Sequence, residues 1–160
     1  MKKIRSAAAL KRLRARWRRQ GLKTVFTNGC FDLIHGGHVH LFRQAKDQGD
    51  ILIVAVNSDA SVRRLKGPSR PIFPLAERME VLAAFGAIDY VTWFEDDTPQ
   101  KIIAALLPDV LVKGGDWGAG EIVGTADVEA AGGRVYRVPY RRGRSSTNLI
   151  EKIRKSARRR

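Results

Sequence analysis

The fold is decided by the segment Thr27-Asn28-Gly29-Cys30-Phe31-Asp32-Leu33-Ile34-His35-Gly36-Gly37-His38, which joins the end of an apolar strand to the start of a helix. Gly29 permits a tight turn after the strand, and the Gly36-Gly37 pair lets the backbone approach a bulky anion. Free N–H groups and the positive end of the helix dipole favour a phosphate at a helix N-terminus. His35 and His38 lie there and add imidazole N–H donors. The segment therefore predicts a nucleotide site that holds a polyphosphate.

Length and cysteine content bound the class of protein. The chain has 160 residues, of which 44% are hydrophobic, so we expect one domain with a substantial core. Cys30 is the only cysteine, which excludes an intrachain disulfide and favours a reducing, cytoplasmic setting. No apolar run approaches the roughly 20 residues that span a bilayer, and the basic N-terminus lacks the apolar core of a secretory signal. We therefore expect neither a membrane protein nor an exported one.

The formal net charge of +14 is concentrated at the two ends of the chain. Residues 1–23 carry a net charge of +10 and residues 141–160 one of +8, whereas residues 24–140 carry −4. This distribution argues against nucleic acid as the main partner, because such proteins usually carry their basic surface on the folded domain. Leu10, Leu13 and Trp17 recur at helical spacing among arginines. They predict an extra basic, amphipathic helix in residues 1–22, docked on a domain formed by residues 23–160 and dispensable for the chemistry.

The rest of the chain alternates apolar strands with amphipathic helices. The unbroken apolar run Ile51 to Val56 indicates a strand buried on both faces, as in a parallel sheet covered by helices. The pattern predicts an α/β fold of the Rossmann-like, doubly wound type with five parallel strands. Further strands are expected at residues 90–93, 110–112 and 134–138. Helices are expected at residues 38–48, in a short segment that ends at 64, and at 74–85, 125–131 and from 147. Another helix is expected to start at Thr98-Pro99, with Thr98 as its cap, and to bury an apolar stripe formed by Ile102, Ile103, Leu106 and Leu107.

Two further loops carry glycines and cations. Lys66-Gly67-Pro68-Ser69-Arg70-Pro71 holds turn residues and two cations, and we interpret it as a lid over a ligand. Lys113-Gly114-Gly115-Asp116-Trp117-Gly118 follows a predicted strand. Open α/β sheets bind ligands at the carboxyl ends of their strands, so we expect this second loop at the nucleotide edge.

Taken in order, these motifs resemble those of the cytidylyltransferase-type nucleotidyltransferases, whose hallmark His-x-Gly-His stands here as His35-Gly36-Gly37-His38. A second hallmark, a Ser/Thr-rich helix start, stands as Ser145-Ser146-Thr147-Asn148. Within the family, the chain is most similar to the heptose 1-phosphate adenylyltransferases of lipopolysaccharide assembly, from about Val25 to Ile153. The blocks that carry this similarity are Arg63-Arg64-Leu65-Lys66-Gly67, Ser69-Arg70-Pro71, Glu77-Arg78-Met79, Thr98-Pro99-Gln100 and Val112-Lys113-Gly114-Gly115-Asp116.

The resemblance implies transfer of AMP from ATP to heptose 1-phosphate, giving ADP-heptose and pyrophosphate. A phosphate nucleophile is already ionised near neutral pH, so the protein supplies alignment and charge neutralisation rather than a general base. The family motif places His35, His38 and Lys66 at the reacting phosphates as catalytic groups. Mg²⁺ would bridge the phosphates, with Asp32 a weak candidate to touch it and no metal site formed by the protein itself.

The resemblance also assigns binding residues by motif position. Those that bind the nucleotide are expected to be Thr27, Asn28, Gly29, Cys30, Phe31, Asp32, Gly37, Lys113, Gly115, Asp116, Trp117, Ser145, Ser146 and Thr147. Those that bind the second substrate are expected to be Arg63, Arg70, Arg78 and Arg144. Arginine serves equally well as a phosphate ligand and in structural ion pairs, so Arg70 and Arg78 either bind substrate phosphate or pair with acids that fix loops. For Cys30 the alternative is packing beneath the loop.

Three alternatives stay open at this point. A cytidylyltransferase acting on glycerol 3-phosphate shares the fold and both hallmarks. A non-enzymatic nucleotide-binding protein is the alternative of a different class. A zinc site formed by Cys30, His35 and His38 is disfavoured, because a structural site normally has four ligands. We also expect a homodimer and, since no kinase segment is present, a separate kinase that supplies heptose 1-phosphate.

Overall fold

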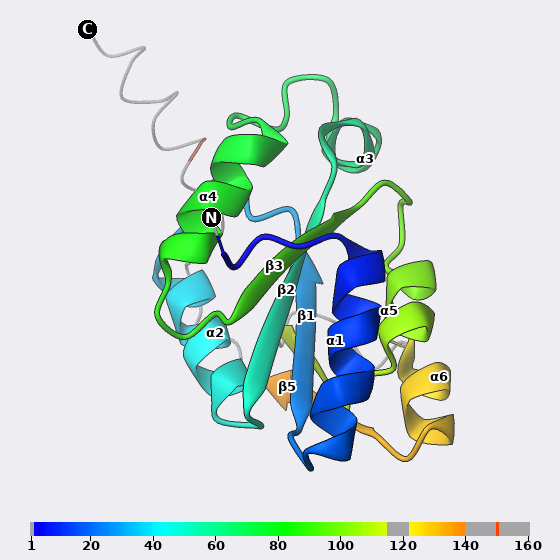
Figure 1. The fold of residues 1–160 in the computed structure, drawn as a ribbon. Coiled ribbons are helices and arrows are strands. Elements are labelled where there is room, and N and C mark those ends of the chain that lie inside the picture. Colours follow the sequence, from blue (N-terminus) through cyan, green and yellow to red (C-terminus); the bar gives the residue numbers. More distant parts are fainter. Residues whose placement is uncertain (1, 115–121, 140–149, 151–160) are drawn as a thin grey trace, which may run out of the picture.

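The computed structural model describes residues 2–114, 122–139 and 150 of the chain. Five parallel strands form one sheet in the order β3-β2-β1-β4-β5, with β1 at its centre (Figure 1). The strands are β1 (Thr24–Gly29), β2 (Ile51–Asn57), β3 (Tyr90–Phe94), β4 (Val110–Gly114) and β5 (Arg134–Val138). The predicted doubly wound α/β fold with five parallel strands is confirmed. The helix expected from residue 147 lies outside the described residues.

Helices cover both faces of the sheet. α2 (Gly36–Lys46) and α4 (Leu75–Ala84) cover one face, α1 (Ala7–Arg19), α5 (Gln100–Leu106) and α6 (Thr125–Ala130) cover the other, and α3 (Asp59–Lys66) follows β2 (Figure 1). Each face of the sheet therefore has its own apolar core.

None of the described helices is long and apolar enough to cross a bilayer.

β2 shows how one strand serves both cores. All seven of its residues are buried, as the unbroken apolar run predicted. Successive side chains of a strand point to opposite faces. Leu52, Val54 and Val56 accordingly pack in the core under α2 and α4, whereas Ile51, Ile53 and Ala55 pack in the core under α1 and α5.

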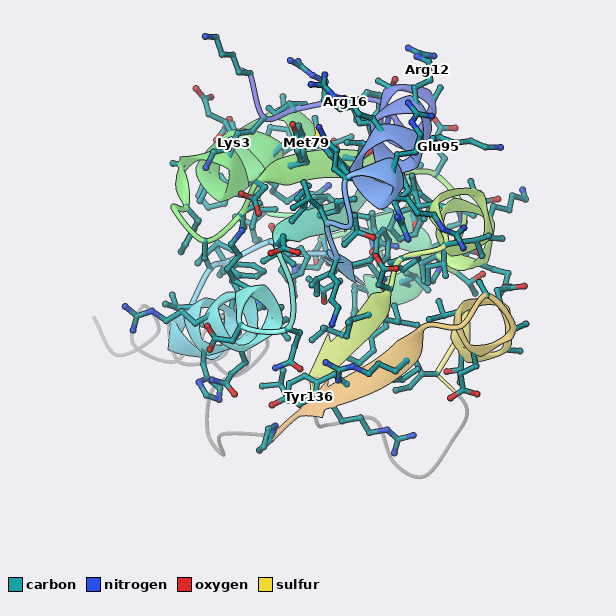
Figure 2. All side chains as sticks on the ribbon, turned by 60° about the horizontal axis from the view of Figure 1, so that its bottom comes forward. Lys3, Arg12, Arg16, Met79, Glu95 and Tyr136 are labelled. Atoms are coloured by element: carbon teal, nitrogen blue, oxygen red, sulfur yellow. The ribbon has the colours of Figure 1, made fainter. Side chains whose placement is uncertain are left out.

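α1 contributes directly to the second core. Leu10 is fully buried, and Trp17 is 6% exposed, with its ring centroid 5.0 Å from that of Tyr90. The residues that lead into α1 run beside β3, where the Val91 N–H donates to the Lys3 carbonyl oxygen over 3.1 Å. Lys3 lies next to α4 (Figure 2), and its Nζ donates to the Phe85 carbonyl oxygen over 2.8 Å. Removing residues 1–20 would expose the apolar core residues that Leu10 and Trp17 cover. The truncated chain should therefore lose stability, in contrast to the expectation that residues 1–22 are dispensable.

α5 differs from the prediction at both ends. Its N-cap is Pro99 with no side-chain cap, so the predicted capping by Thr98 is wrong. Leu107, expected on the buried stripe, is instead the C-cap in the left-handed region (φ 42°) with its side chain 36% exposed. A left-handed residue ends the helix by turning the chain away, which carries the Leu107 side chain out of the core. Its carbonyl oxygen accepts a hydrogen bond from Arg14 Nη2 over 3.2 Å.

Asp109 joins α1 to the amino edge of the sheet. Its Oδ2 accepts from the Thr24 N–H (2.7 Å) and the Thr24 hydroxyl (2.9 Å), and its Oδ1 accepts from Arg14 Nη2 (2.9 Å). Arg14 is only 8% exposed, and its Nε and Nη1 have no hydrogen-bond partner among the described residues. Asp109 therefore supplies the counter-charge that lets α1 bury this guanidinium.

Replacing Asp109 with asparagine should lower the free energy of unfolding by about 2–3 kcal/mol, because a buried arginine loses its ion pair. Urea unfolding of both proteins measures the difference. Asp97→Asn is the matched control, since the Arg64–Asp97 pair has side chains 50% and 52% exposed. Exposed pairs contribute less than about 1 kcal/mol. Equal losses of unfolding free energy in the two variants would show that burial does not make the Arg14–Asp109 pair more stabilising than an exposed pair.

Candidate active site

The turn after β1 is made by Phe31 rather than by Gly29. Phe31 adopts φ 44° and is 5% exposed, with its ring centroid 5.3 Å from that of Phe42 in the core. Gly29 belongs to the strand, where an added Cβ would lie 3.0 Å from Phe31 Cζ. The glycine is thus needed for the close approach of the Phe31 ring, and burial of that ring offsets the backbone strain.

Two histidines cap the N-terminus of α2. The Gly37 N–H donates to His35 Nδ1 over 3.1 Å, and the His35 N–H donates to His38 Nδ1 over 3.4 Å. The reciprocal capping starts the helix at Gly36, before the predicted start at His38. The two rings stack with centroids 3.8 Å apart. Because Nδ1 is the acceptor in both rings, the proton of each neutral imidazole is assigned to Nε2.

His38 is neutral at physiological pH. Burial, reinforced by the positive charge that His35 can carry, lowers the pKa of His38 to about 4. The Phe31 ring meets His38 edge-on with centroids 5.3 Å apart, which contributes to that burial. His38 can therefore offer an uncharged N–H donor at the mouth of α2.

Asp32 fixes the segment that we interpreted as a lid. Its buried carboxylate accepts hydrogen bonds from the Ile72 N–H (2.8 Å), the Phe73 N–H (3.0 Å) and Arg70 Nε. Burial opposes ionisation, but the donors from Phe73, Ile72 and Arg70 outweigh it and hold the pKa of Asp32 below its ordinary value. Arg70 thus forms the loop-fixing ion pair, the second of the two alternatives for this residue.

Arg78 joins the same loop to the ends of two strands. It is 2% exposed and lies on α4. Its guanidinium donates to the carbonyl oxygens of Cys30 (2.6 Å), Asn57 (2.9 Å) and Phe73 (3.0 Å), and to the Asp59 carboxylate (2.7 Å). With its N–H groups directed at protein acceptors, Arg78 positions the site rather than facing a substrate.

Several cations converge on the turn after β1. Burial raises the pKa of the Cys30 thiol, although the nearby charges of Lys66, Arg78 and Arg70 act in the opposite direction. Lys66 is the last residue of α3 and is exposed, so its side chain is accessible from solvent. Arg63 is exposed one turn earlier on the same helix. Cys30 itself is partly buried beneath this group.

On the other side of β1, Lys113 at the end of β4 donates to Asn28 Oδ1. Burial lowers the pKa of Lys113 to about 8, and the residue is 7% exposed. Thr27 is fully buried within β1, and its hydroxyl has no hydrogen-bond partner in the described part of the chain. Asn28 and Lys113 therefore lie together at the edge, whereas Thr27 lies beneath it.

Some predicted residues lie outside the described residues. These are Gly115, Asp116, Trp117, Arg144, Ser145, Ser146 and Thr147. Two residues that organise the site were not predicted from the sequence, namely Asn57 and Asp59, which accept hydrogen bonds from Arg78. The sequence did contain a signal for them, because both polar residues follow closely after the apolar run Ile51 to Val56. The carboxyl ends of parallel strands form the ligand edge of such a sheet.

The described side chains do not form a magnesium site. Mg²⁺ prefers carboxylate and phosphate oxygens. Among residues 2–114, 122–139 and 150, no group of three or more His, Cys, Asp or Glu residues is placed to hold a metal ion. Both oxygens of Asp32 already accept hydrogen bonds from the loop. The protein atoms described therefore do not fit a resident Mg²⁺.

Comparison with known proteins identifies the family. The sequence profile of the cytidylyltransferase-like family matches residues 26–152. The chain belongs to the cytidylyltransferase-like family. Membership makes it a nucleotidyltransferase enzyme with a nucleotide substrate.

Similar proteins extend this cytidylyltransferase-like assignment. Bifunctional protein HldE of Hahella chejuensis (strain KCTC 2396) is 56% identical over 138 residues, which cover 86% of this chain and 29% of that protein. Bifunctional protein HldE of Proteus mirabilis (strain HI4320) is 53% identical over 152 residues, which cover 95% of this chain and 32% of that protein. The chain thus spans about 30% of the length of these relatives.

Solved structures support the same cytidylyltransferase-like fold. The lipopolysaccharide core biosynthesis protein from Thermoplasma volcanium GSS1 superposes with a TM-score of 0.62 at 27% identity, covering 76% of this chain and 98% of that one. Pantoate-beta-alanine ligase from Francisella tularensis superposes with a TM-score of 0.63 at 16% identity, over 96% of this chain and 77% of that one. The second likeness shows the fold alone.

The buried, neutral His38 should make stability depend on pH. Between pH 6.5 and about 4 the unfolded chain binds a proton at this residue and the folded chain does not, so acidification favours unfolding. His38 alone should lower the free energy of unfolding by on the order of 3 kcal/mol when the pH falls from 6.5 to about 4. Urea unfolding of the native protein and of His38→Asn at several pH values measures the effect. The variant should show the shallower pH dependence, and parallel curves would contradict the assignment.

Proposed function

We propose that this chain transfers AMP from ATP to heptose 1-phosphate, giving ADP-heptose and pyrophosphate. The substrate assignment is supported by the motif blocks shared with heptose 1-phosphate adenylyltransferases and by the identity to the HldE proteins. The similar Thermoplasma volcanium protein is named for lipopolysaccharide core biosynthesis, which agrees with this biosynthetic context. The observation that carries the chemistry is the stacked His35–His38 pair at the N-terminus of α2.

The reaction needs alignment more than acid–base chemistry. A phosphate oxygen of heptose 1-phosphate attacks the α-phosphorus of ATP, a new P–O bond forms, and the bond to the departing pyrophosphate breaks. The nucleophile is already an anion, so no proton has to be removed. The protein must hold two anions together and stabilise negative charge that grows on the leaving group.

The histidine pair suits that task. Nδ1 of each ring is used in capping α2, which orients the opposite ring edge, Nε2–H, as a fixed donor. The helix dipole adds positive potential at the same point. Because burial keeps it neutral near neutral pH, His38 can stabilise charge by hydrogen bonding. The histidines therefore act as pre-oriented donors to the phosphates.

Cations around the turn complete the proposed site. Lys66 reaches across the reacting phosphates from the end of α3, with Arg63 beside it for the sugar phosphate, while Asn28 and Lys113 lie on the nucleotide side. Arg70 and Arg78 position the loop and the strand ends. The remaining contacts stay predictions. They are Ser145, Ser146 and Thr147 for the ATP phosphates, Arg144 for the second substrate, and Gly115, Asp116 and Trp117 for the nucleotide. No step is assigned to Mg²⁺, which we expect to arrive with ATP.

Pyrophosphate release with Mg²⁺ tests the assignment, with ATP or CTP crossed against heptose 1-phosphate or glycerol 3-phosphate. We expect release only with ATP and heptose 1-phosphate. Dependence on CTP would move the assignment to a cytidylyltransferase. Saturable ATP binding without release in any of the four mixtures would instead support a non-enzymatic nucleotide-binding protein.

Replacing His35 with asparagine should lower turnover by about 10²–10³-fold, because it removes one oriented donor to developing charge. Asparagine is itself a good N-cap, so the stability of α2 should change little. Pyrophosphate release and thermal unfolding, measured on the same samples, separate the two effects. His40→Asn on the same helix is the control and should turn over at the native rate. Near-normal turnover of His35→Asn would remove His35 from the site.

The remaining expectations about context are part of this proposal. We propose a cytoplasmic enzyme that forms a homodimer and receives heptose 1-phosphate from a kinase activity. The HldE relatives are named as bifunctional, and this chain spans about 30% of their length.

A further inference from the structure

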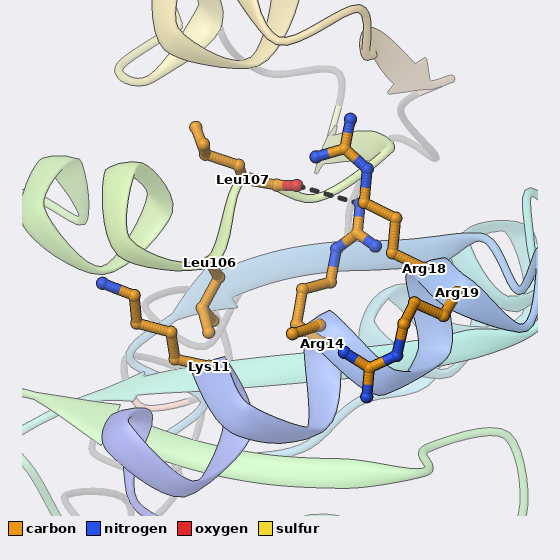
Figure 3. A pocket seen from close by; sticks show the side chains of 7 residues that line it. Lys11, Arg14, Arg18, Arg19, Leu106 and Leu107 are labelled. Atoms are coloured by element: carbon orange, nitrogen blue, oxygen red, sulfur yellow. Dashed lines mark hydrogen bonds between the residues drawn. The ribbon is translucent and has the colours of Figure 1, made fainter.

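A groove lies between α1 and the C-terminal end of α5, away from the proposed active site (Figure 3). We call it the α1–α5 groove. It encloses about 460 Å³. Its lining consists of Lys11, Arg14, Ala15, Arg18, Arg19, Leu106 and Leu107. Asp109, which binds Arg14, directly precedes β4, so the groove lies at the amino edge of the sheet. The proposed active site lies at the opposite, carboxyl edge.

The groove combines an apolar surface with a basic rim. Lys11, Ala15 and Arg18 follow one another at helical spacing, which puts them on one face of α1. Across from them, the left-handed turn at Leu107 leaves an aliphatic side chain 36% exposed. Ala15 is small and exposed, so room for a ligand group remains between the two sides.

The charge in the groove is poorly compensated. Arg14 is 8% exposed, and its Nε and Nη1 have no hydrogen-bond partner in the described part of the chain. Of the four cations that line the groove, Arg14 alone takes part in a salt bridge among the described residues, with Asp109. Lys11 and Arg18 are exposed. A concave surface lined by one sign of charge concentrates potential and attracts the opposite sign.

Other anionic occupants fit this surface less well. Single-stranded nucleic acid binds through aromatic stacking, and no aromatic residue of the described chain lines the groove. Insertion into a membrane would need the apolar residues of α1, but Leu10 and Trp17 are committed to the core. The chain's own C-terminus does not match either, since residues 141–160 carry nine Lys or Arg and a single acid.

We propose that the α1–α5 groove binds an acidic segment of a partner protein. Carboxylates of that segment pair with Lys11, Arg18 and Arg19, and one of its aliphatic side chains packs against Ala15 and Leu107. Charge complementarity sets the rate and selectivity of such an association, and the aliphatic anchor supplies its apolar contact. The surface is independent of nucleotide transfer.

A fluorescent peptide that alternates glutamate with leucine is the probe, titrated into the full chain and followed by anisotropy. Lys11→Glu/Arg18→Glu should weaken binding by about tenfold or more, because two attractive contacts become repulsive. The matched control is Arg12→Glu/Arg16→Glu, which changes the net charge equally on the same helix. Arg12 and Arg16 are exposed but do not line the groove, and Arg12 projects from the outer side of α1 (Figure 2). The control should weaken binding less than about twofold.

Two further probes decide between charge and shape. A peptide with serine in place of leucine should bind more weakly than the leucine peptide. An RNA oligonucleotide of equal charge should bind the native protein and Lys11→Glu/Arg18→Glu with the same affinity. Thermal unfolding and pyrophosphate release of both double variants should match the native protein. Equal weakening by the two double variants, tighter binding of the RNA through the groove, or no peptide binding would each overturn the proposal.

Discussion

The structure depends on the buried guanidinium of Arg78. Four hydrogen bonds connect it to Cys30 after β1, to Asn57 at the end of β2, to Asp59 at the start of α3, and to Phe73 in the loop before α4. A buried cation is costly unless its donors are satisfied, so this arrangement is favourable only when all these segments hold their native positions. Arg78 therefore couples the carboxyl edge of the sheet to the loop that borders the site.

Asp32 extends the same constraint to the loop. It is buried beside the turn after β1 and holds Arg70, Ile72 and Phe73 through its carboxylate. With two arginines engaged in positioning, Lys66 stays exposed beside the turn, and anion binding by Lys66 and the histidine pair belongs to the proposed function. The segment from Lys66 to Phe73 thus has an exposed cation, Lys66, at its start and an anchored end at Ile72 and Phe73.

The sequence was sufficient for the parts of the molecule that short-range rules govern. Hydrophobic periodicity predicted every strand of the described sheet to within a few residues, because strands buried on both faces leave an unbroken apolar run. The glycine and histidine spacing after β1 predicted the location of the candidate site. The roles of individual residues were less predictable. Gly29 allows the close packing of the Phe31 ring rather than forming the turn, and Leu107 is exposed rather than buried.

By itself, the sequence determined the fold class and the edge of the sheet at which the candidate site lies, since both follow from patterns along a continuous stretch of chain. Only the tertiary structure decided which arginines are paired with carboxylates of the protein. The sequence left Arg70 and Arg78 open between phosphate binding and ion pairing, because their partners Asp32 and Asp59 come from distant positions and become neighbours only on folding. Burial likewise decides the charge of His38, because desolvation depends on atoms packed around the ring rather than on adjacent residues.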